Sequence, residues 1–133
     1  MYLPKVIAFN AKDETAAKRY AVIADEMKLG GETTEEKIKL LIAYLRGNRD
    51  RVAEVVASLP GVHMTPVEAT YLAWIDVRDL HLAKPAAHCE AHGLGLSDGS
   101  DFGAPGWLRL NFGCPRATLD DALARFSKAV AAA

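Results

Sequence analysis

The segment from Trp107 to Arg116 constrains the fold of this chain more than any other part of the sequence, because it has the pattern of a strand with a charge inside it. Its sequence is WLRLNFGCPR, and the side chains of a strand alternate between two faces. One face therefore carries Leu108, Leu110 and Phe112, and the other carries Trp107, Arg109 and Asn111. A positive charge set into a strand usually meets a carboxylate, so Arg109 is a candidate carboxylate-binding residue.

Length and composition predict one ordinary globular domain. The chain has 133 residues, of which 50% are hydrophobic and 25% are charged, enough for a core that folds alone. Its net charge of −1 favours neither nucleic acid nor an anionic membrane as a partner. No apolar run approaches the roughly 18 residues of a membrane span, and the first residues lack the pattern of a signal peptide, so we expect a cytoplasmic protein. In that compartment Cys89 and Cys114 are expected as free thiols, either buried or partly exposed.

Two helices are predicted in the first 60 residues, after an irregular lead over residues 1–13. Apolar side chains recur at helical spacing over about 14–27, and the Gly30-Gly31 pair ends that helix. Thr33 and Glu36 have the spacing of a capping box, which predicts the start of a second helix that runs to about residue 58. Gly47 in its middle weakens this helix by about 1 kcal/mol relative to alanine and allows a bend.

After residue 61 the pattern changes to short strands. Residues 62–65 and 70–77 are predicted strands, and the second is apolar on both faces, which is typical of a central strand. A short helix over 85–92 and a tight reversal over 98–103 follow, and the last helix is expected to begin with Thr118 as its N-cap. We therefore predict an α+β fold, in which N-terminal helices are followed by a small sheet flanked by helices.

A family resemblance rests on five segments that follow one another in order. They are LRGNRD (45–50), LPGV (59–62), EATYLAWID (68–76), GLSDGSDFG (95–103) and the segment around Arg109. Over residues 41–133 the chain resembles the C-terminal small domain of fold-type I pyridoxal-phosphate (PLP) enzymes, specifically the cystathionine β-lyase-like C–S lyases of aminotransferase class I/II. The resemblance implies an aminotransferase small-domain-like sandwich in which Arg109 stands where the family's arginine binds the substrate α-carboxylate. The large domain, the Schiff-base lysine and the phosphate-binding residues of that family have no counterpart here, so we expect no cofactor.

The first 42 residues have a different resemblance. The segments LPKVIAFN (3–10), AKRYAVIAD (17–25) and LGGETTEEK (29–37) are similar to a helical part of iron-containing alcohol dehydrogenases. Two such sources in one chain lead us to expect an engineered or recombined chimera, joined within the helix near residues 40–44. We expect one folded domain over residues 1–133, made of a helical segment at 1–42 and a small-domain-like segment at 43–133.

These resemblances favour a non-catalytic protein, not an enzyme, with no small-molecule substrate, because each family's cofactor-binding part is missing. The alternative is a fragment or component of a PLP-dependent C–S lyase or aminotransferase whose Arg109 binds a substrate carboxylate. A small metal or carboxylate binder is a third, weaker hypothesis. Loss of the large domain would uncover apolar surface, so a homodimer through the helices at 14–27 and 34–58 is expected, with a monomer as the alternative.

Each candidate side chain also has a plainer interpretation. Arg109 is either the carboxylate receptor or a solvated or locally paired arginine. His88 and His92 lie four residues apart on a predicted helix beside Cys89, a spacing that could ligate zinc. No third ligand is evident, so we expect no metal site and favour a histidine pair near a helix C-terminus. A polar cluster either binds a cation or only stabilises a turn of the chain: Asp98, Ser100 and Asp101.

Overall fold

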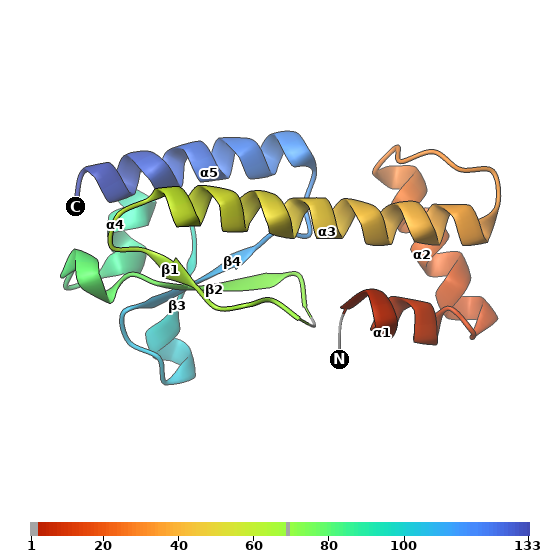
Figure 1. Ribbon diagram of the computed structural model, residues 1–133, viewed down its shortest axis with the longest axis horizontal. Coiled ribbons are helices and arrows are strands. Elements are labelled where there is room, and N and C mark those ends of the chain that lie inside the picture. Colours follow the sequence, from red (N-terminus) through yellow and green to blue (C-terminus); the bar gives the residue numbers. More distant parts are fainter. Residues whose placement is uncertain (1–2, 69) are drawn as a thin grey trace. The chain divides into compact units, whose positions relative to one another are not determined.

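The computed structural model describes residues 3–68 and 70–133. It divides into two compact units, one made of the described residues within 1–47 and 68–71, the other of residues 48–67 and 72–133. The long helix α3 (Thr34–Ser58) contributes residues to both units (Figure 1).

The first unit is helical. It contains α1 (Leu3–Asn10), α2 (Glu14–Glu26) and the first part of α3. The predicted capping box at the start of α3 is confirmed, because the Glu36 amide donates to Thr33 Oγ1 (3.2 Å) and the Thr33 amide donates to Glu36 Oε2 (3.1 Å). A small cluster of buried side chains holds these helices together: Ile7, Ala17 and Ile38.

Helix α1 differs from the irregular lead predicted for residues 1–13. Pro4 suggested a break, but a proline in the first turn of a helix removes no hydrogen bond, because the first N–H groups have no partner within the helix. The Ala11 amide donates to the Ile7 carbonyl (2.8 Å), and the Ile7 side chain is buried. Burial of one apolar side chain in the cluster therefore outweighs the turn-like composition of this segment.

The second unit contains a four-stranded antiparallel sheet in the order β1-β2-β4-β3. The strands are β1 (His63–Met64), β2 (Leu72–Asp76), β3 (Ser97–Asp98) and β4 (Trp107–Asn111). β2 is a central strand, as its pattern predicted, and it lies beside the strand that carries Arg109, with Trp74 directly opposite Arg109.

Helices cover one face of this sheet. The second part of α3 and α5 (Arg116–Ala131) lie side by side on that face, and α4 (Pro85–Ala91) packs at its edge (Figure 1). The largest fully buried apolar side chains of the shared core come from the strands, from the residues directly after β2 and β4, and from these helices: Val52, Val56, Ile75, Val77, Leu108, Leu110, Phe112, Leu119, Leu123 and Phe126. The α+β fold, with helices followed by a small sheet flanked by helices, is confirmed.

Two boundaries in this unit differ from the prediction. The reversal predicted at residues 98–103 does lie between two antiparallel strands, β3 and β4, but it contains a 3-10 helix, η2 (Gly99–Phe102), instead of a tight turn. The Asp98 carboxylate caps η2 by accepting the Ser100 amide (2.8 Å). α5 begins at Arg116 rather than after Thr118, because the carbonyl of Pro115 already accepts the Leu119 amide (3.0 Å). Thr118 therefore lies inside the first turn.

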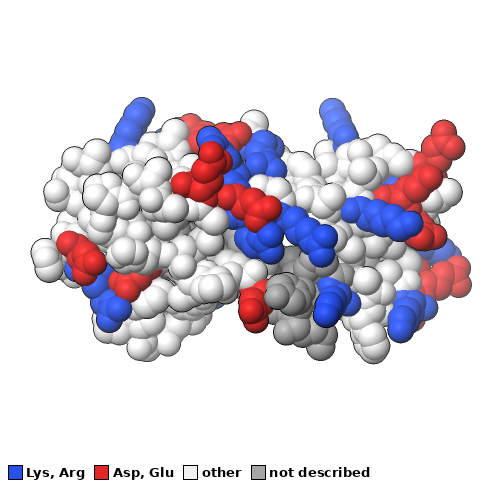
Figure 2. Space-filling model, in the orientation of Figure 1, with Lys and Arg blue, Asp and Glu red and all other residues white. Residues whose placement is uncertain are grey.

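None of the described helices combines the length and the apolar character that crossing a membrane requires. In the space-filling view, acidic and basic side chains are interspersed on the visible face (Figure 2). This mixed pattern fits the near-zero net charge of the sequence.

Candidate carboxylate-binding site

The sheet face that the helices leave uncovered carries the candidate site. The antiparallel register places Trp74 and Ser97 on either side of Arg109, and Asp76 opposite Trp107, so these five side chains share one face. We call this the outer face of the sheet. Its residues are half-buried, whereas the alternate residues of β2 and β4 point into the core. The alternation in the sequence therefore correctly predicted that Arg109 lies on the face opposite to the core side chains.

Arg109 is held by two neighbours that carry no charge. Its Nη2 donates to Ser97 Oγ (3.2 Å), and its guanidinium carbon lies 4.3 Å from the centre of the Phe102 ring. Such stacking is favourable because the ring face is electron-rich. Within residues 3–68 and 70–133, Arg109 forms no ion pair with a carboxylate. An arginine has five N–H donors in a fixed plane, so most of these donors are not used by Ser97.

Phe102 reaches this face from η2. The planes of the Phe102 and Trp74 rings are nearly perpendicular (87°), with the ring centres 5.6 Å apart, and half of the Phe102 surface (50%) is exposed. Offset or perpendicular aromatic pairs of this kind are the favoured geometries. Phe102 therefore contacts both the ring of Trp74 and the guanidinium of Arg109.

Arg78, just beyond the end of β2, provides an internal comparison. Like Arg109 it lies over an aromatic ring, with its guanidinium carbon 5.6 Å from the centre of Trp107. Unlike Arg109 it binds a carboxylate through two bonds, from Nε to Asp76 Oδ1 (2.9 Å) and from Nη2 to Asp76 Oδ2 (2.7 Å). These bonds lower the pKa of Asp76 below its ordinary value. Arg78 is thus paired with a carboxylate, whereas Arg109 forms no ion pair among the described residues.

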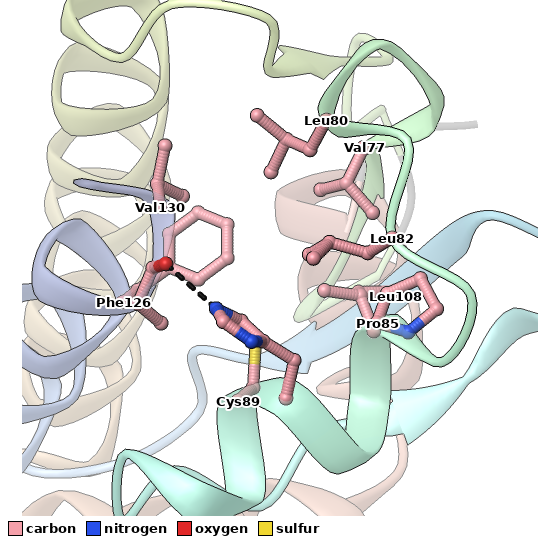
Figure 3. Close-up of a pocket in the computed structure, with 10 residues that line it drawn as sticks. Val77, Leu80, Leu82, Pro85, Cys89, Leu108, Phe126 and Val130 are labelled. Carbon is pink, nitrogen blue, oxygen red and sulfur yellow. Dashed lines mark hydrogen bonds between the residues drawn. The ribbon is translucent and has the colours of Figure 1, made fainter. Parts of the chain in front are cut away.

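The histidine pair has a different setting. His88 Nε2 lies 2.9 Å from the Ala129 carbonyl (dashed line in Figure 3). His92 Nδ1 lies 2.9 Å from the His88 carbonyl. In the described part of the chain no three His, Cys, Asp or Glu side chains are grouped so that they could hold a metal ion. The neighbouring Cys89 faces an apolar cavity of about 10 Å³, and burial raises the pKa of its thiol to about 11. We expect no nucleophilic role for this thiol.

The cluster of Asp98, Ser100 and Asp101 serves the local turn. The Asp98 carboxylate accepts the Ser100 amide at the start of η2, and this bond lowers the pKa of Asp98.

The sequence pattern did not identify Ser97 and Phe102 as neighbours of Arg109. The two-residue strand β3 leaves no periodic signal from which its register against β4 could be read.

Comparison with known proteins gives one family. The chain matches the family described as Aminotransferase class I and II over residues 14–126. It is 34% identical over 96 residues to a cystathionine β-lyase from Corynebacterium glutamicum, covering 70% of this chain and 26% of that protein.

Solved structures agree. OvoB is 44% identical with a TM-score of 0.70, covering 74% of this chain and 26% of that one. A PLP-bound C–S lyase from Staphylococcus hominis, complexed with the inhibitor L-cycloserine, is 25% identical with a TM-score of 0.65 and the same coverage. The chain spans about a quarter of the length of the curated relatives it matches.

The lysines of this chain do not form a PLP site by themselves. Seven of the eight are exposed, and the eighth, Lys37, pairs with the Asp25 carboxylate (2.7 Å) in the first unit. A lysine that forms a Schiff base needs a sheltered setting that surrounds the cofactor, and none of these has one. The described residues therefore do not fit PLP on their own.

The comparisons correct two expectations. The expectation that the chain is not an enzyme is wrong, because its relatives are lyases and aminotransferases. The expectation that no small-molecule substrate is involved conflicts with the same relatives. The family match also begins at residue 14, so it crosses the join expected near residues 40–44.

Proposed function

The chain belongs to the aminotransferase class I and II family, and from this premise we propose that it supplies the small-domain part of a PLP-dependent C–S lyase or aminotransferase, with Arg109 binding the carboxylate of the substrate. The observation that carries the proposal is the contrast between two arginines on one sheet. Arg78 already holds a carboxylate in a two-bond arrangement, and Arg109 has only a hydroxyl and an aromatic ring beside it.

The setting of Arg109 suits this role for three physical reasons. The strand and its two neighbours fix the backbone, so that the guanidinium starts from a defined place. The Phe102 ring contacts the guanidinium of Arg109, and a planar guanidinium can bind a carboxylate through two parallel hydrogen bonds. The Ser97 hydroxyl occupies one donor and leaves the remaining ones for a ligand.

The chemistry at the reacting carbon would come from PLP, which acts as an electron sink when bound. We place the groups that hold PLP in the part of the relatives' length that this chain does not span, because the lysines here are exposed or paired. The role proposed for this chain is accordingly limited to binding and orienting the substrate by its carboxylate.

A titration of the 133-residue chain with sodium acetate tests the proposal, with sodium chloride at equal ionic strength as the control. Acetate stands in for the substrate carboxylate, and the Arg Nε–Hε signals are followed by NMR. We expect a saturating change at Arg109 with a dissociation constant of about 0.1 M or weaker, because an exposed ion pair contributes only about 0.2–1 kcal/mol. Arg78 should change little. Equal changes at all eight arginines, or none at Arg109, would reject the proposal.

The origin of residues 1–42 is a separate hypothesis. We infer a recombined join near residues 40–44 from the resemblance of the first segment to iron-containing alcohol dehydrogenases, and such a join would lie inside the continuous helix α3. Sequencing the source DNA across these codons tests it. The recombined origin would be rejected if these codons belong to one uninterrupted gene and if homologous enzymes carry the same first segment.

A further inference from the structure

Asn48, in the second part of α3, is the one polar side chain among the buried residues of the described chain (0% exposed). Its amide group reaches the segment that follows β4. Nδ2 donates to the carbonyl of Phe112 (2.7 Å) and to the carbonyl of Cys114 (2.9 Å). Asn48 therefore joins α3 to the end of the strand that carries Arg109.

The orientation of this amide is defined by its partners. Of the two ends of an asparagine amide, only the NH₂ group can donate hydrogen bonds to carbonyl oxygens, so Nδ2 must face the two carbonyls. Oδ1 points elsewhere, is buried, and has no hydrogen-bond partner among the described residues. A buried acceptor without a partner destabilises the fold. The same helix fills nearby core positions with the apolar side chains of Val52 and Val56, so packing alone does not account for an asparagine at this position.

The place of the two hydrogen bonds explains what Asn48 does. β3 pairs with β4 only at Leu108 and Arg109, so beyond Arg109 the strand is paired only with β2. The next residues form a turn, in which the Asn111 side chain accepts the Gly113 amide (2.8 Å). Asn48 holds this turn from the helical side, three to five residues after Arg109.

We propose that Asn48 is a positioning residue for Arg109: by binding the Phe112 and Cys114 carbonyls it fixes the end of β4, and so keeps the Arg109 guanidinium over the Phe102 ring. This inference rests on the proposed function of Arg109 as the carboxylate-binding residue.

The test compares Asn48→Ala with Val52→Ala in the full chain. Val52 is equally buried in the same helix, but its side chain has no polar atom with which to hold the turn, so it serves as the matched control for loss of core packing. The readout is the Nε–Hε signal of Arg109, which the Phe102 ring current displaces. A Phe102→Leu variant calibrates the size of that displacement.

We expect Asn48→Ala to lose at least half of the ring-current displacement and to raise the hydrogen-exchange rate of the Gly113 amide about tenfold or more. It should also weaken the acetate response of Arg109 severalfold. Val52→Ala should keep all three properties. An unchanged Arg109 signal in folded Asn48→Ala, or an equal change in both variants, would overturn the inference.

Measurements on the unmodified chain keep the inference testable if Asn48→Ala fails to fold. NMR couplings through the hydrogen bonds, from Asn48 Nδ2 to the carbonyl carbons of Phe112 and Cys114, should be detected, and their absence would overturn the inference. The proposed function fails in a different way, because it predicts the acetate response of the unmodified chain. A missing acetate response would leave the ring-current comparison intact and would reject the function of Arg109 alone.

Discussion

Gly99, at the start of η2, has no room for a side chain. A Cβ atom added there would overlap the carbonyl oxygen of Ala104, would lie 2.6 Å from the carbonyl oxygen of Trp107, and would lie 2.8 Å from the Trp107 Cβ. Two of these neighbours are backbone atoms, which cannot rotate away as the end of a flexible side chain can. Gly99→Ala therefore forces η2 and β4 apart, and Phe102 moves with η2.

The expected loss is that of overpacking a tight site, about 1–3 kcal/mol in the free energy of unfolding. For a domain of this size it corresponds to a decrease of about 4–12 °C in Tm. Gly99 does not have a positive φ, so the loss comes from the contacts and not from backbone strain.

Gly95→Ala is the matched control. A Cβ at Gly95 would meet no atom within 4 Å, and this glycine also lacks a positive φ, so we expect a change of less than about 0.5 kcal/mol. Urea unfolding followed by tryptophan fluorescence measures both variants, because Trp74 and Trp107 both lie on the sheet. If Gly99→Ala unfolds at the same urea concentration as Gly95→Ala, the described packing of η2 against β4 is incorrect.

Three further predictions concern pH, thiol reactivity and association. The bond to Arg78 lowers the pKa of Asp76. The stabilisation that this pair contributes is therefore complete above the ordinary pKa of 3.8 and is lost as the pH falls through the lower folded-state value. The urea midpoints of Asp76→Asn at pH 3 and pH 7 should accordingly differ less from each other than those of the unmodified chain. Because the pKa of Cys89 rises from 9.0 to about 11, its thiol should react about 100-fold more slowly with a disulfide reagent at pH 8 in the folded chain than in urea, and equal rates would contradict its burial. For the predicted homodimer, light scattering should give twice 14.4 kDa, reduced to one chain by Ile23→Asp, whose side chain is 44% exposed on α2; a constant mass of one chain would exclude it.

The sequence predicted the parts of this fold that have a periodic or local chemical signal. The alternation in the segment around Arg109 placed the strand and its two faces, and the Thr33–Glu36 spacing placed the start of α3. Both signals are read within a few residues and need no tertiary partner. Helix α1 lacked such a signal, because its stability depends on burying Ile7 among side chains from α2 and α3.

The candidate site was predictable only in its central residue. Arg109 stood out because a charge interrupts an apolar strand, but its neighbours come from elements that are short or distant in sequence. Ser97 is in a two-residue strand, Phe102 is in a turn of 3-10 helix, and Asn48 acts across 64 residues. Contacts of this kind follow from the register of the sheet, which no pattern in a single sequence specifies.

The central claim is that Arg109 binds the substrate carboxylate in a PLP-dependent enzyme, and a hybrid enzyme tests it most directly. In the hybrid, this chain replaces the corresponding quarter of the Corynebacterium glutamicum cystathionine β-lyase, and cystathionine cleavage is measured with Arg109→Lys and Arg78→Lys variants. We predict that Arg109→Lys lowers kcat/KM by about 10–100-fold, because lysine cannot reproduce a charged two-bond contact, while Arg78→Lys stays within about threefold. A folded, active hybrid in which both variants have the same kcat/KM would contradict the claim.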